Sequence, residues 1–476
     1  MSEPAADAPS LYAAREPIFP RRVSGWFRTM KWRLMILTLG IYYVSPWIRW
    51  DRGPELPDQA ILIDLAGRRF FFFWIEIWPH EFYFVAGLLI MAGLGLFLFT
   101  SALGRVWCGY ACPQTVWTDL FIAVERWVEG DRNARIKLLK QKYDLRKFRL
   151  RMTKWTLWLL IAVATGGAWV FYFADAPTLA VQLVTLEAHY IAYASIGILT
   201  ATTFIFGGFM REQVCIYMCP WPRIQAAMMD EQTLTVAYRE WRGEPRSKHL
   251  KRDDGAPKGD CIDCNACVAV CPTGVDIREG QQLGCITCAL CIDACDDVMH
   301  KLGRERGLID YISLADEKRE RDGGKAEPAW KRIFRPRVLI YTAAWSAIGL
   351  GLLFALFIRS EIDISVSAVR NPVYVTLSDG GVRNAYDMRL RNKHGEARAY
   401  RIAVASDDAL RLRLEGTLER RVTVPANETM EQRLYVIAKP DNRAAAANST
   451  PIRFWVEDVI NGERTHADAR FRGRSD

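Results

Sequence analysis

Eight of the twelve cysteines in this chain fall into two copies of one pattern. Both copies have the spacing C-x2-C-x2-C-x3-C, and the second begins 24 residues after the first. The members are Cys261, Cys264, Cys267 and Cys271 in the first copy, and Cys285, Cys288, Cys291 and Cys295 in the second. This spacing is typical of the loops that hold iron–sulfur clusters in bacterial ferredoxins. The pattern therefore predicts two [4Fe–4S] clusters and one-electron chemistry.

In two-cluster ferredoxins the fourth cysteine of each run binds the other cluster. The predicted ligand sets are therefore crossed. The first cluster would take Cys261, Cys264, Cys267 and Cys295, and the second would take Cys285, Cys288, Cys291 and Cys271. The second run ends in Asp296 where the first has a proline, and this departure leaves all eight ligands in place.

Structural zinc is the main alternative, because zinc sites also use C-x2-C pairs. A zinc ion needs four ligands from two such pairs, and it has no use for a third cysteine two residues further on, in both copies. A disulfide framework would require an oxidising compartment, whereas dense thiolate clusters indicate a reducing one. The spacing therefore favours iron–sulfur clusters and a cytoplasmic location for this segment.

The remaining four cysteines also repeat, as two C-x3-C-P motifs, and we call them the cysteine quartet. Its members are Cys108 and Cys112 in the first motif, and Cys215 and Cys219 in the second. Positions i and i+4 share one face of a helix, so each pair would present two thiols in one direction. The proline marks a turn or kink just after them. We expect the four sulfurs to face one another.

The chemistry of the quartet stays open at the level of sequence. Thiolate and thioether ligands select Cu(I) over harder ions, so a copper or redox site is one interpretation. A third iron–sulfur cluster and a reversible disulfide are others. Small buried residues at helix ends are the structural alternative, since free cysteine packs as a small hydrophobe. Two copies of the same frame favour a functional site.

Membrane helices must position these cysteines. The chain has 476 residues, 17 Trp and a mean hydropathy of −0.02, which fits an average over apolar and polar parts. Five apolar runs approach the length of a membrane span. They are about Leu34–Ile48, Phe82–Leu103, Trp155–Ala174, Tyr190–Phe209 and Val338–Ile358. The first is short and contains a proline. No cleavable signal peptide is visible at the N-terminus.

The charges of the connecting segments predict the orientation. Residues 1–33 carry six Lys or Arg against three acids, and residues 104–154 carry twelve against five. Residues 49–81 carry four against six, and residues 175–188 have no basic residue. This alternation is typical of a multi-pass protein of the bacterial inner membrane. It places segments 104–154 and 210–337 in the cytoplasm, in agreement with the cysteine chemistry.

The fold class that follows is an α-helical polytopic membrane protein with an inserted α+β ferredoxin domain of the bacterial 2[4Fe–4S] type and an all-β C-terminal domain. Residues 359–476 lack cysteine and read as about eight short strands separated by turns, which is typical of an immunoglobulin-like sandwich. The predicted parts are a cytoplasmic segment 1–33, four transmembrane helices in 34–209, a cytoplasmic region 210–337 with the ferredoxin at about 255–300, a fifth helix 338–358 and a periplasmic sandwich 359–476.

The net charge of +9 does not indicate nucleic acid, because the basic residues concentrate beside the apolar runs. Anionic lipid attracts cations in that position. We therefore expect the tract Arg132–Lys154 to be an amphipathic segment facing membrane lipid, with a docking surface for an acidic partner as the alternative.

Several stretches resemble the cytochrome c oxidase accessory proteins of the CcoG/FixG/RdxA family. They are the segments Trp107–Pro113, Cys271–Arg278 and Cys285–Asp296, together with the five-span layout and the strand-rich tail. The resemblance implies a role in assembly of the cbb3-type cytochrome c oxidase, by reduction of Cu(II) to Cu(I) as a cupric reductase. It also implies that the eight ferredoxin cysteines hold clusters and that the quartet lies at or near the copper site.

The partners implied are subunits of that oxidase or copper-delivery proteins, and a cytoplasmic electron donor, because no glycine-rich nucleotide loop is present. Two alternatives remain. One is a quinol-linked membrane polyferredoxin of the NapH/NosR type, which donates to another redox protein. The other is a non-catalytic scaffold for oxidase assembly.

Overall fold

The computed structural model describes residues 17–53, 56–247, 259–328, 331, 334–359, 362–406, 409–417, 419–426 and 428–474. Residues 1–16 of the expected N-terminal segment and residues 255–258 at the start of the expected ferredoxin region lie outside these ranges. The chain divides into two compact units, which are considered separately. The first comprises Met1–Ile48 and Gln59–Leu352, and the second comprises Arg49–Asp58 and Leu353–Asp476.

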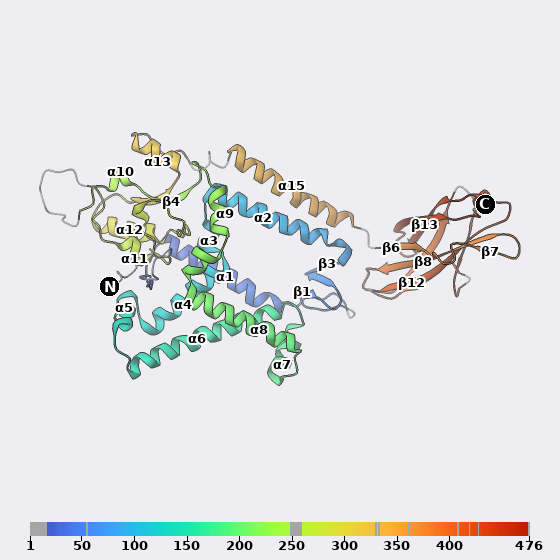
Figure 1. The fold of residues 1–476 in the computed structure, drawn as a ribbon, viewed down its shortest axis with the longest axis horizontal. Coiled ribbons are helices and arrows are strands. Elements are labelled where there is room, and N and C mark those ends of the chain that lie inside the picture. Colours follow the sequence, from blue (N-terminus) through green and yellow to red (C-terminus); the bar gives the residue numbers. More distant parts are fainter. Residues whose placement is uncertain are drawn as a thin grey trace, which may run out of the picture. The chain divides into compact units, whose positions relative to one another are not determined.

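Helices dominate the first unit (Figure 1). Before the ferredoxin cysteines they are α1 (Trp26–Val44), α2 (Tyr83–Leu103), α3 (Val106–Tyr110), α4 (Pro113–Glu129), α5 (Arg132–Lys140), α6 (Leu145–Val170), α7 (Ala176–Thr185), α8 (Tyr190–Thr203), the π-helices η3 (Phe204–Met210) and η4 (Val214–Met218), α9 (Trp221–Met228) and α10 (Glu240–Gly243). Short 3-10 helices lie at η1 (Ser45–Trp47) and η2 (Pro79–Glu81). Strands β1 (Ile61–Asp64), β2 (Arg69–Phe72) and β3 (Ile75–Ile77) form an antiparallel sheet.

Three helices in the described part of the chain are long and apolar enough to cross a membrane. They are Tyr83–Leu103, Tyr190–Met210 and Pro336–Ile358, the last being α15. They coincide with three of the five expected spans. Side chains of α2 and α15 contact each other, for example Phe97 with Tyr341, so these two helices lie side by side. The chain is thus a membrane-associated protein.

The other two apolar runs form helices with different bounds from those expected. The run at 34–48 belongs to α1, which begins at Trp26 and ends at Val44. It stops there because Pro46, inside the 3-10 turn Ser45–Trp47, supplies no backbone N–H. The run at 155–174 belongs to α6, whose first half is basic and whose last residue is Val170.

The tract Arg132–Lys154 does not face outward throughout, and the expected lipid-facing orientation is wrong for buried cations near its two ends. Arg135, on α5, and Lys154, on α6, are 1% and 2% exposed. Both pair with Glu125 of α4, and Lys154 also lies 2.9 Å from Glu129. A buried carboxylate needs cations beside it, and these acids on α4 draw the basic residues inward.

The ferredoxin cysteines lie between two strands that are far apart in the sequence. Strand β4 (Thr235–Tyr238) pairs with β5 (Ile309–Ile312) in antiparallel register, with Thr235 opposite Ile312. Between them come α11 (Ala266–Val270), the 3-10 helix η5 (Ile277–Glu279) and α12 (Leu290–Lys301), and α13 (Leu314–Arg321) follows β5. Their apolar side chains and several cysteines form one buried core. This is an α+β arrangement, as expected.

The second unit contains a two-sheet β-sandwich (Figure 1). One sheet has the order β10-β12-β8-β6, with β7 also paired to β8, and the other has the order β11-β9-β13-β14. The strands are β6 (Ile362–Ala368), β7 (Val375–Thr376), β8 (Val382–Asn392), β9 (Arg398–Ala405), β10 (Arg411–Leu414), β11 (Arg421–Val424), β12 (Thr429–Ala438), β13 (Thr450–Asp458) and β14 (Arg464–Phe471).

Buried and less buried side chains alternate strictly along β8, from Val382 to Asn392, as a sandwich strand with one core face requires. The sequence predicts about eight strands in this segment, and its described residues form nine, β6 to β14. The short helix α16 (Arg443–Ala446) was not predicted.

Candidate metal centres

The two ferredoxin loops repeat in conformation as well as in sequence. In the first loop Asp263 and Asn265 have positive φ angles of 49° and 56°, and in the second Thr287 and Ala289 have φ angles of 56° and 60°. These pairs flank the second cysteine of each copy. Non-glycine residues in this region each cost about 1–3 kcal/mol, so the strain must be held by surrounding contacts. Such strain concentrates at functional sites.

Specific side chains hold both loops in this shape. In the first, the Arg278 guanidinium donates to Asp263 at 2.7 Å and to Asn265 at 2.5 Å, the two strained residues themselves. In the second, the Tyr311 hydroxyl donates to the carbonyl of Thr287 at 2.8 Å, and the Tyr110 hydroxyl donates to the carbonyl of Cys288 at 3.0 Å. The sequence analysis did not identify these three residues, because their partners are distant along the chain or lie in the loops themselves.

Each loop closes over a cavity lined by four cysteines. The first cavity is lined by Cys261, Cys264, Cys267 and Cys295, and the second by Cys271, Cys285, Cys288 and Cys291. The structure therefore brings together the two ligand sets written above, with one member of each set taken from the other run. Four thiols around an enclosed cavity suit a [4Fe–4S] cluster.

The burial of these thiols affects their protonation. Burial raises the pKa of Cys288 and of Cys295 to about 12, and that of Cys267 to about 11. A backbone N–H, that of Val275, also points at the sulfur of Cys271 at 3.3 Å. Metal binding must displace the thiol protons, and a bound cluster would stabilise the deprotonated form.

The cysteine quartet is built from two segments of the same design. Each segment leaves an apolar helix through a residue of positive φ four positions before the first cysteine: Gly104 at 65° and Arg211 at 39°. The second cysteine of each pair, Cys112 or Cys219, is extended, with ψ of 128° and 124°. Its N–H bonds to the carbonyl five residues earlier, at 2.9 Å and 2.8 Å. A proline follows each: Pro113 begins α4, and Pro220 is the N-cap of α9.

The expectation that each pair lies on one face of a helix is therefore wrong. Cys108 lies within α3 and Cys215 within η4, whereas Cys112 and Cys219 lie just past the ends of these helices. The proline that follows each pair causes the break, because the residue before a proline is pushed to extended backbone. The turn expected from the prolines is confirmed.

Hydrogen bonds join the two segments. Gln225, which is fully buried on α9 after the second pair, accepts from the Cys108 thiol at 3.0 Å. Gln114, on α4 after the first pair, donates to the carbonyls of Phe206 and Arg211 before the second pair. Each segment is thus fastened to the other. The cysteine spacing does not predict a role for either glutamine, although each follows its proline within five residues.

The thiols of the quartet also affect the pKa values of two of its members, Cys108 and Cys215. Burial first, and then the nearby Cys112, Cys215 and Cys219, raise the pKa of Cys108 to about 12 against the opposing charge of Arg105. Burial, Cys112 and Cys219 raise the pKa of Cys215 to about 11. Among the described residues no three His, Cys, Asp or Glu side chains are gathered closely enough for a single metal ion. The quartet is therefore a group of neighbouring thiols at a helix junction.

The first quartet segment rests directly on the second ferredoxin loop. A Cβ atom at Gly109 would lie 2.7 Å from the carbonyl oxygen of Ile286 and 3.0 Å from the Cα of Cys288, so only glycine allows this approach. Tyr110 adds the bond to Cys288 described above. Cys108 packs against the same apolar cluster as Cys288 and Leu290. The two cysteine groups are therefore neighbours, because the backbone at Gly109 packs directly on the backbone at Cys288.

Comparison with known families covers both cysteine groups. Residues 210–314 match a 4Fe–4S dicluster domain, and residues 84–133 match a 4Fe–4S binding domain. Residues 352–474 match the Ig-like fold at the C-terminus of FixG. The second unit is therefore an Ig-like domain, and the expected iron–sulfur clusters are supported by two family matches. Both matches to 4Fe–4S domains also include one of the C-x3-C-P motifs.

Three curated relatives match almost the whole chain. Protein RdxB of Cereibacter sphaeroides is 68% identical over 475 residues, covering 100% of both chains. Protein RdxA of the same organism is 61% identical and covers 96% of both. Nitrogen fixation protein FixG of Rhizobium meliloti is 54% identical, covering 97% of this chain and 93% of its own. The resemblance drawn from the cysteine motifs is confirmed, and this chain is a membrane-associated 4Fe–4S electron-transfer protein of the FixG/RdxA family.

Proposed function

We propose that this protein reduces Cu(II) to Cu(I) at the cysteine quartet during assembly of a cbb3-type cytochrome c oxidase. The observation that carries the proposal is the packing of Gly109 and Tyr110 on the loop of Cys288. It puts thiols that suit Cu(I) directly beside thiols that suit an iron–sulfur cluster. Electron transfer needs this proximity, whereas a purely structural cluster does not.

The proposed ligand assignment follows the two cavities. Cys261, Cys264, Cys267 and Cys295 would hold one [4Fe–4S] cluster, and Cys271, Cys285, Cys288 and Cys291 the other. When bound, these clusters would supply one-electron carriers. The protein's own contribution is to fix the loops through Arg278 and Tyr311 and to bury four of the thiols, those of Cys261, Cys267, Cys288 and Cys295.

Copper is the substrate in this proposal. Cu(II) gains one electron, and the product Cu(I) is the ion that thiolates retain. No proton transfer is required by the reduction itself. The Cys108 thiol donates a hydrogen bond to the side-chain oxygen of Gln225, so this amide fixes the direction of the thiol. Binding of copper would displace the thiol proton and break this bond.

The proposed topology has five spans, with α1 and α6 added to the three apolar helices. Large apolar side chains on both are exposed, including Ile36 and Leu37 on α1 and Leu160 on α6, which suits contact with lipid. In this topology the ferredoxin region and the segment 104–154 are cytoplasmic and the Ig-like domain is periplasmic. The proposed partners are a cytoplasmic electron donor, and oxidase subunits or copper-delivery proteins.

The test is anaerobic Cu(I) formation by the purified full-length protein reduced with dithionite and then freed of excess reductant. Cu(I) is trapped with a chromogenic chelator while the cluster absorbance is followed. We expect the clusters to be reoxidised in step with Cu(I) formation, and the Cys108→Ser and Cys215→Ser proteins to be slower by at least tenfold. Clusters that stay reduced after addition of Cu(II) would refute the proposal.

A further inference from the structure

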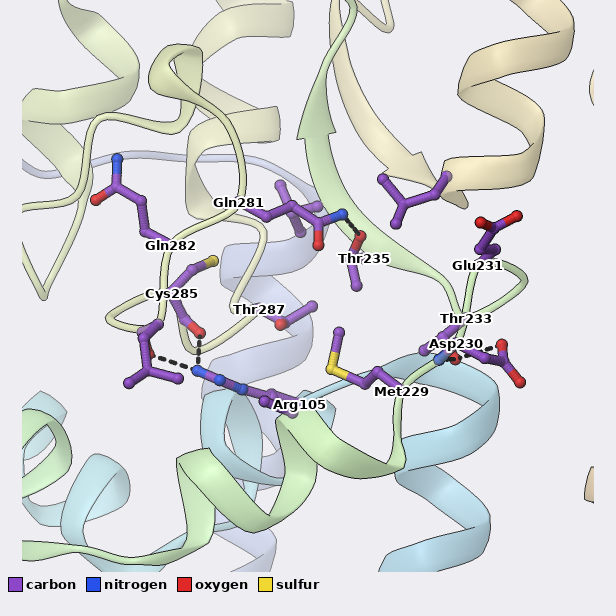
Figure 2. A pocket seen from close by; sticks show the side chains of 14 residues that line it. Arg105, Met229, Asp230, Glu231, Thr233, Thr235, Gln281, Gln282, Cys285 and Thr287 are labelled. Atoms are coloured by element: carbon purple, nitrogen blue, oxygen red, sulfur yellow. Dashed lines mark hydrogen bonds between the residues drawn. The ribbon is translucent and has the colours of Figure 1, made fainter.

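A cavity separate from those lined by four cysteines adjoins the second ferredoxin loop (Figure 2). Its volume is about 460 Å³, within the range of about 300–1,000 Å³ that is typical of small-molecule sites. Side chains from the segment 281–287, from β4 and from the end of α9 surround it. Cys285 lines both this cavity and the neighbouring cysteine-lined one. A molecule bound here would contact a thiol of the second ligand set.

The cavity lies at the ends of two apolar helices. Arg105 follows α2 by two residues and forms part of the wall. Asp230, also in the wall, lies 2.7 Å from Arg335, which precedes α15 by one residue. Arg335 and Thr233 both donate to the carbonyl of Ser101, on α2. Since α2 and α15 are candidate spans, the cavity stands at the boundary between membrane and water.

The lining favours a neutral, partly apolar ligand. Leu283 and Leu314 line the cavity yet are 45% and 39% exposed. Large apolar side chains at the rim suit a molecule that enters from lipid. The amide of Gln281 donates one N–H to Thr235 at 2.6 Å, and an amide NH2 group carries a second N–H that can donate to a ligand carbonyl.

The charges disfavour a phosphate-bearing donor such as a flavin or nicotinamide nucleotide. Arg105, the cation in the lining, already donates to the carbonyls of Leu283, Cys285 and Pro222. Asp230 and Glu231 bring carboxylates to the same wall. Both carboxylates are themselves paired, with Arg335 at 2.7 Å and with Lys318 at 3.2 Å. A phosphate in this cavity would therefore meet cations that are already engaged.

We propose that this cavity binds the headgroup of a membrane quinone. The ring has two carbonyl or hydroxyl oxygens for the polar wall, an apolar tail for the exposed rim, and no charge. This assignment rests on the proposed electron-transfer function, because it gives the second cluster's cysteine loop a small-molecule neighbour from the membrane.

The experiment uses the full-length protein in nanodiscs and a photoreactive azido-ubiquinone. We expect crosslinks on peptides that contain residues 226–235 and 281–287, and competition by excess ubiquinone-1 but not by flavin mononucleotide. Met229→Trp, which fills the cavity, should reduce labelling at least tenfold. Met228→Trp is the matched control, since Met228 does not line the cavity, and should label like the wild type.

Gln281→Leu provides a second variant, because Gln281 is exposed and its replacement is not expected to affect folding. It should reduce labelling severalfold with iron content unchanged. Labels elsewhere in the chain, equal labelling of the two methionine variants, or competition by the flavin alone would overturn the proposal. A wild-type protein that binds quinone but, after reduction with dithionite, does not reduce Cu(II) to Cu(I) would refute copper reduction and would still support the quinone site.

Discussion

The two cysteine groups of this protein are built in opposite ways. The ferredoxin cysteines lie within 35 residues of one another, in loops that share a pattern of positive φ angles and are held by residues that include the nearby Arg278 and the distant Tyr110. The quartet joins residues more than 100 positions apart, and its two segments are neighbours only because side chains of α4 and α9 bridge them. A local motif specifies its ligands by spacing, whereas a distributed one depends on the surrounding fold.

The largest difference is expected between single cysteine substitutions in the two groups. Cys288→Ser removes a ligand of one proposed cluster, so iron should fall by about four atoms per chain, with copper reduction lost. Cys112→Ser, in the quartet, should keep the wild-type iron and sulfide content and lose Cu(I) formation by at least tenfold. Metal analysis and the copper assay check both. Loss of iron from Cys112→Ser as well would mean that the quartet holds a third cluster.

Substitution of Glu125 should disturb the distributed group and spare the local one. Glu125 lies 2.6 Å from Arg211, the strained residue four positions before Cys215, and also pairs with Arg135 and Lys154. Glu125→Gln removes the carboxylate beside the buried Arg135 and beside Arg211, whereas Lys154 keeps Glu129, and the loss should cost about 3–5 kcal/mol. Asp297→Asn removes an exposed pair with Lys301 and should cost at most about 1 kcal/mol. Thermal unfolding in detergent compares the stability of the two variants. Equal losses would contradict a special role for the buried ion pairs of Glu125.

The same site predicts a pH dependence. Burial alone would raise the pKa of Glu125, but Arg211, Arg135 and Lys154 outweigh it, and the pKa is lower than the ordinary 4.5. A carboxylate with a lowered pKa in the folded state adds stability above its unfolded value. That contribution should be complete above pH 4.5 and disappear as pH falls through the lowered pKa. Glu125→Gln should show a weaker decline over this range in unfolding experiments.

The contact between the two groups can be tested at a single glycine. Gly109→Ala would press a methyl group against the backbone of Ile286 and Cys288, at a cost of about 1–3 kcal/mol. The groups should separate and Cu(I) formation slow severalfold. Gly93→Ala, on α2, has open space around the new methyl group and should behave like the wild type. An unchanged rate in Gly109→Ala would show that this contact does not limit electron transfer.

The smallest effect is expected from Tyr110→Phe. It removes the hydroxyl bond to the Cys288 carbonyl while keeping the ring in place. The loss should be about 0.5–1.5 kcal/mol, with iron content unchanged. A small shift of the cluster reduction potential in a redox titration would accompany it, because the backbone carbonyl of the proposed ligand Cys288 loses its hydrogen-bond donor. No shift would assign Tyr110 to packing alone.

The sequence alone determined the iron–sulfur chemistry, the three most apolar helices and most of the sandwich. Each depends on residues close together in the chain: cysteine spacing, an uninterrupted apolar run, or alternation along a strand. The end of α1 and the extended backbone of Cys112 and Cys219 also have local causes, in the nearby prolines. For the two cysteine pairs, the i, i+4 spacing predicts a continuous helix, whereas the proline after each pair breaks it.

Only the tertiary structure decided what lies beside the cysteines. Gln225 reaches Cys108 across 117 positions, Tyr110 reaches Cys288 across 178, and Arg135 turns inward because Glu125 is buried nearby. Such contacts leave no periodicity or spacing in one sequence, since a hydrogen bond or an ion pair between distant segments constrains each partner separately. The chain encodes its metal-binding loops locally, and the packing of its helices sets what those loops can exchange electrons with.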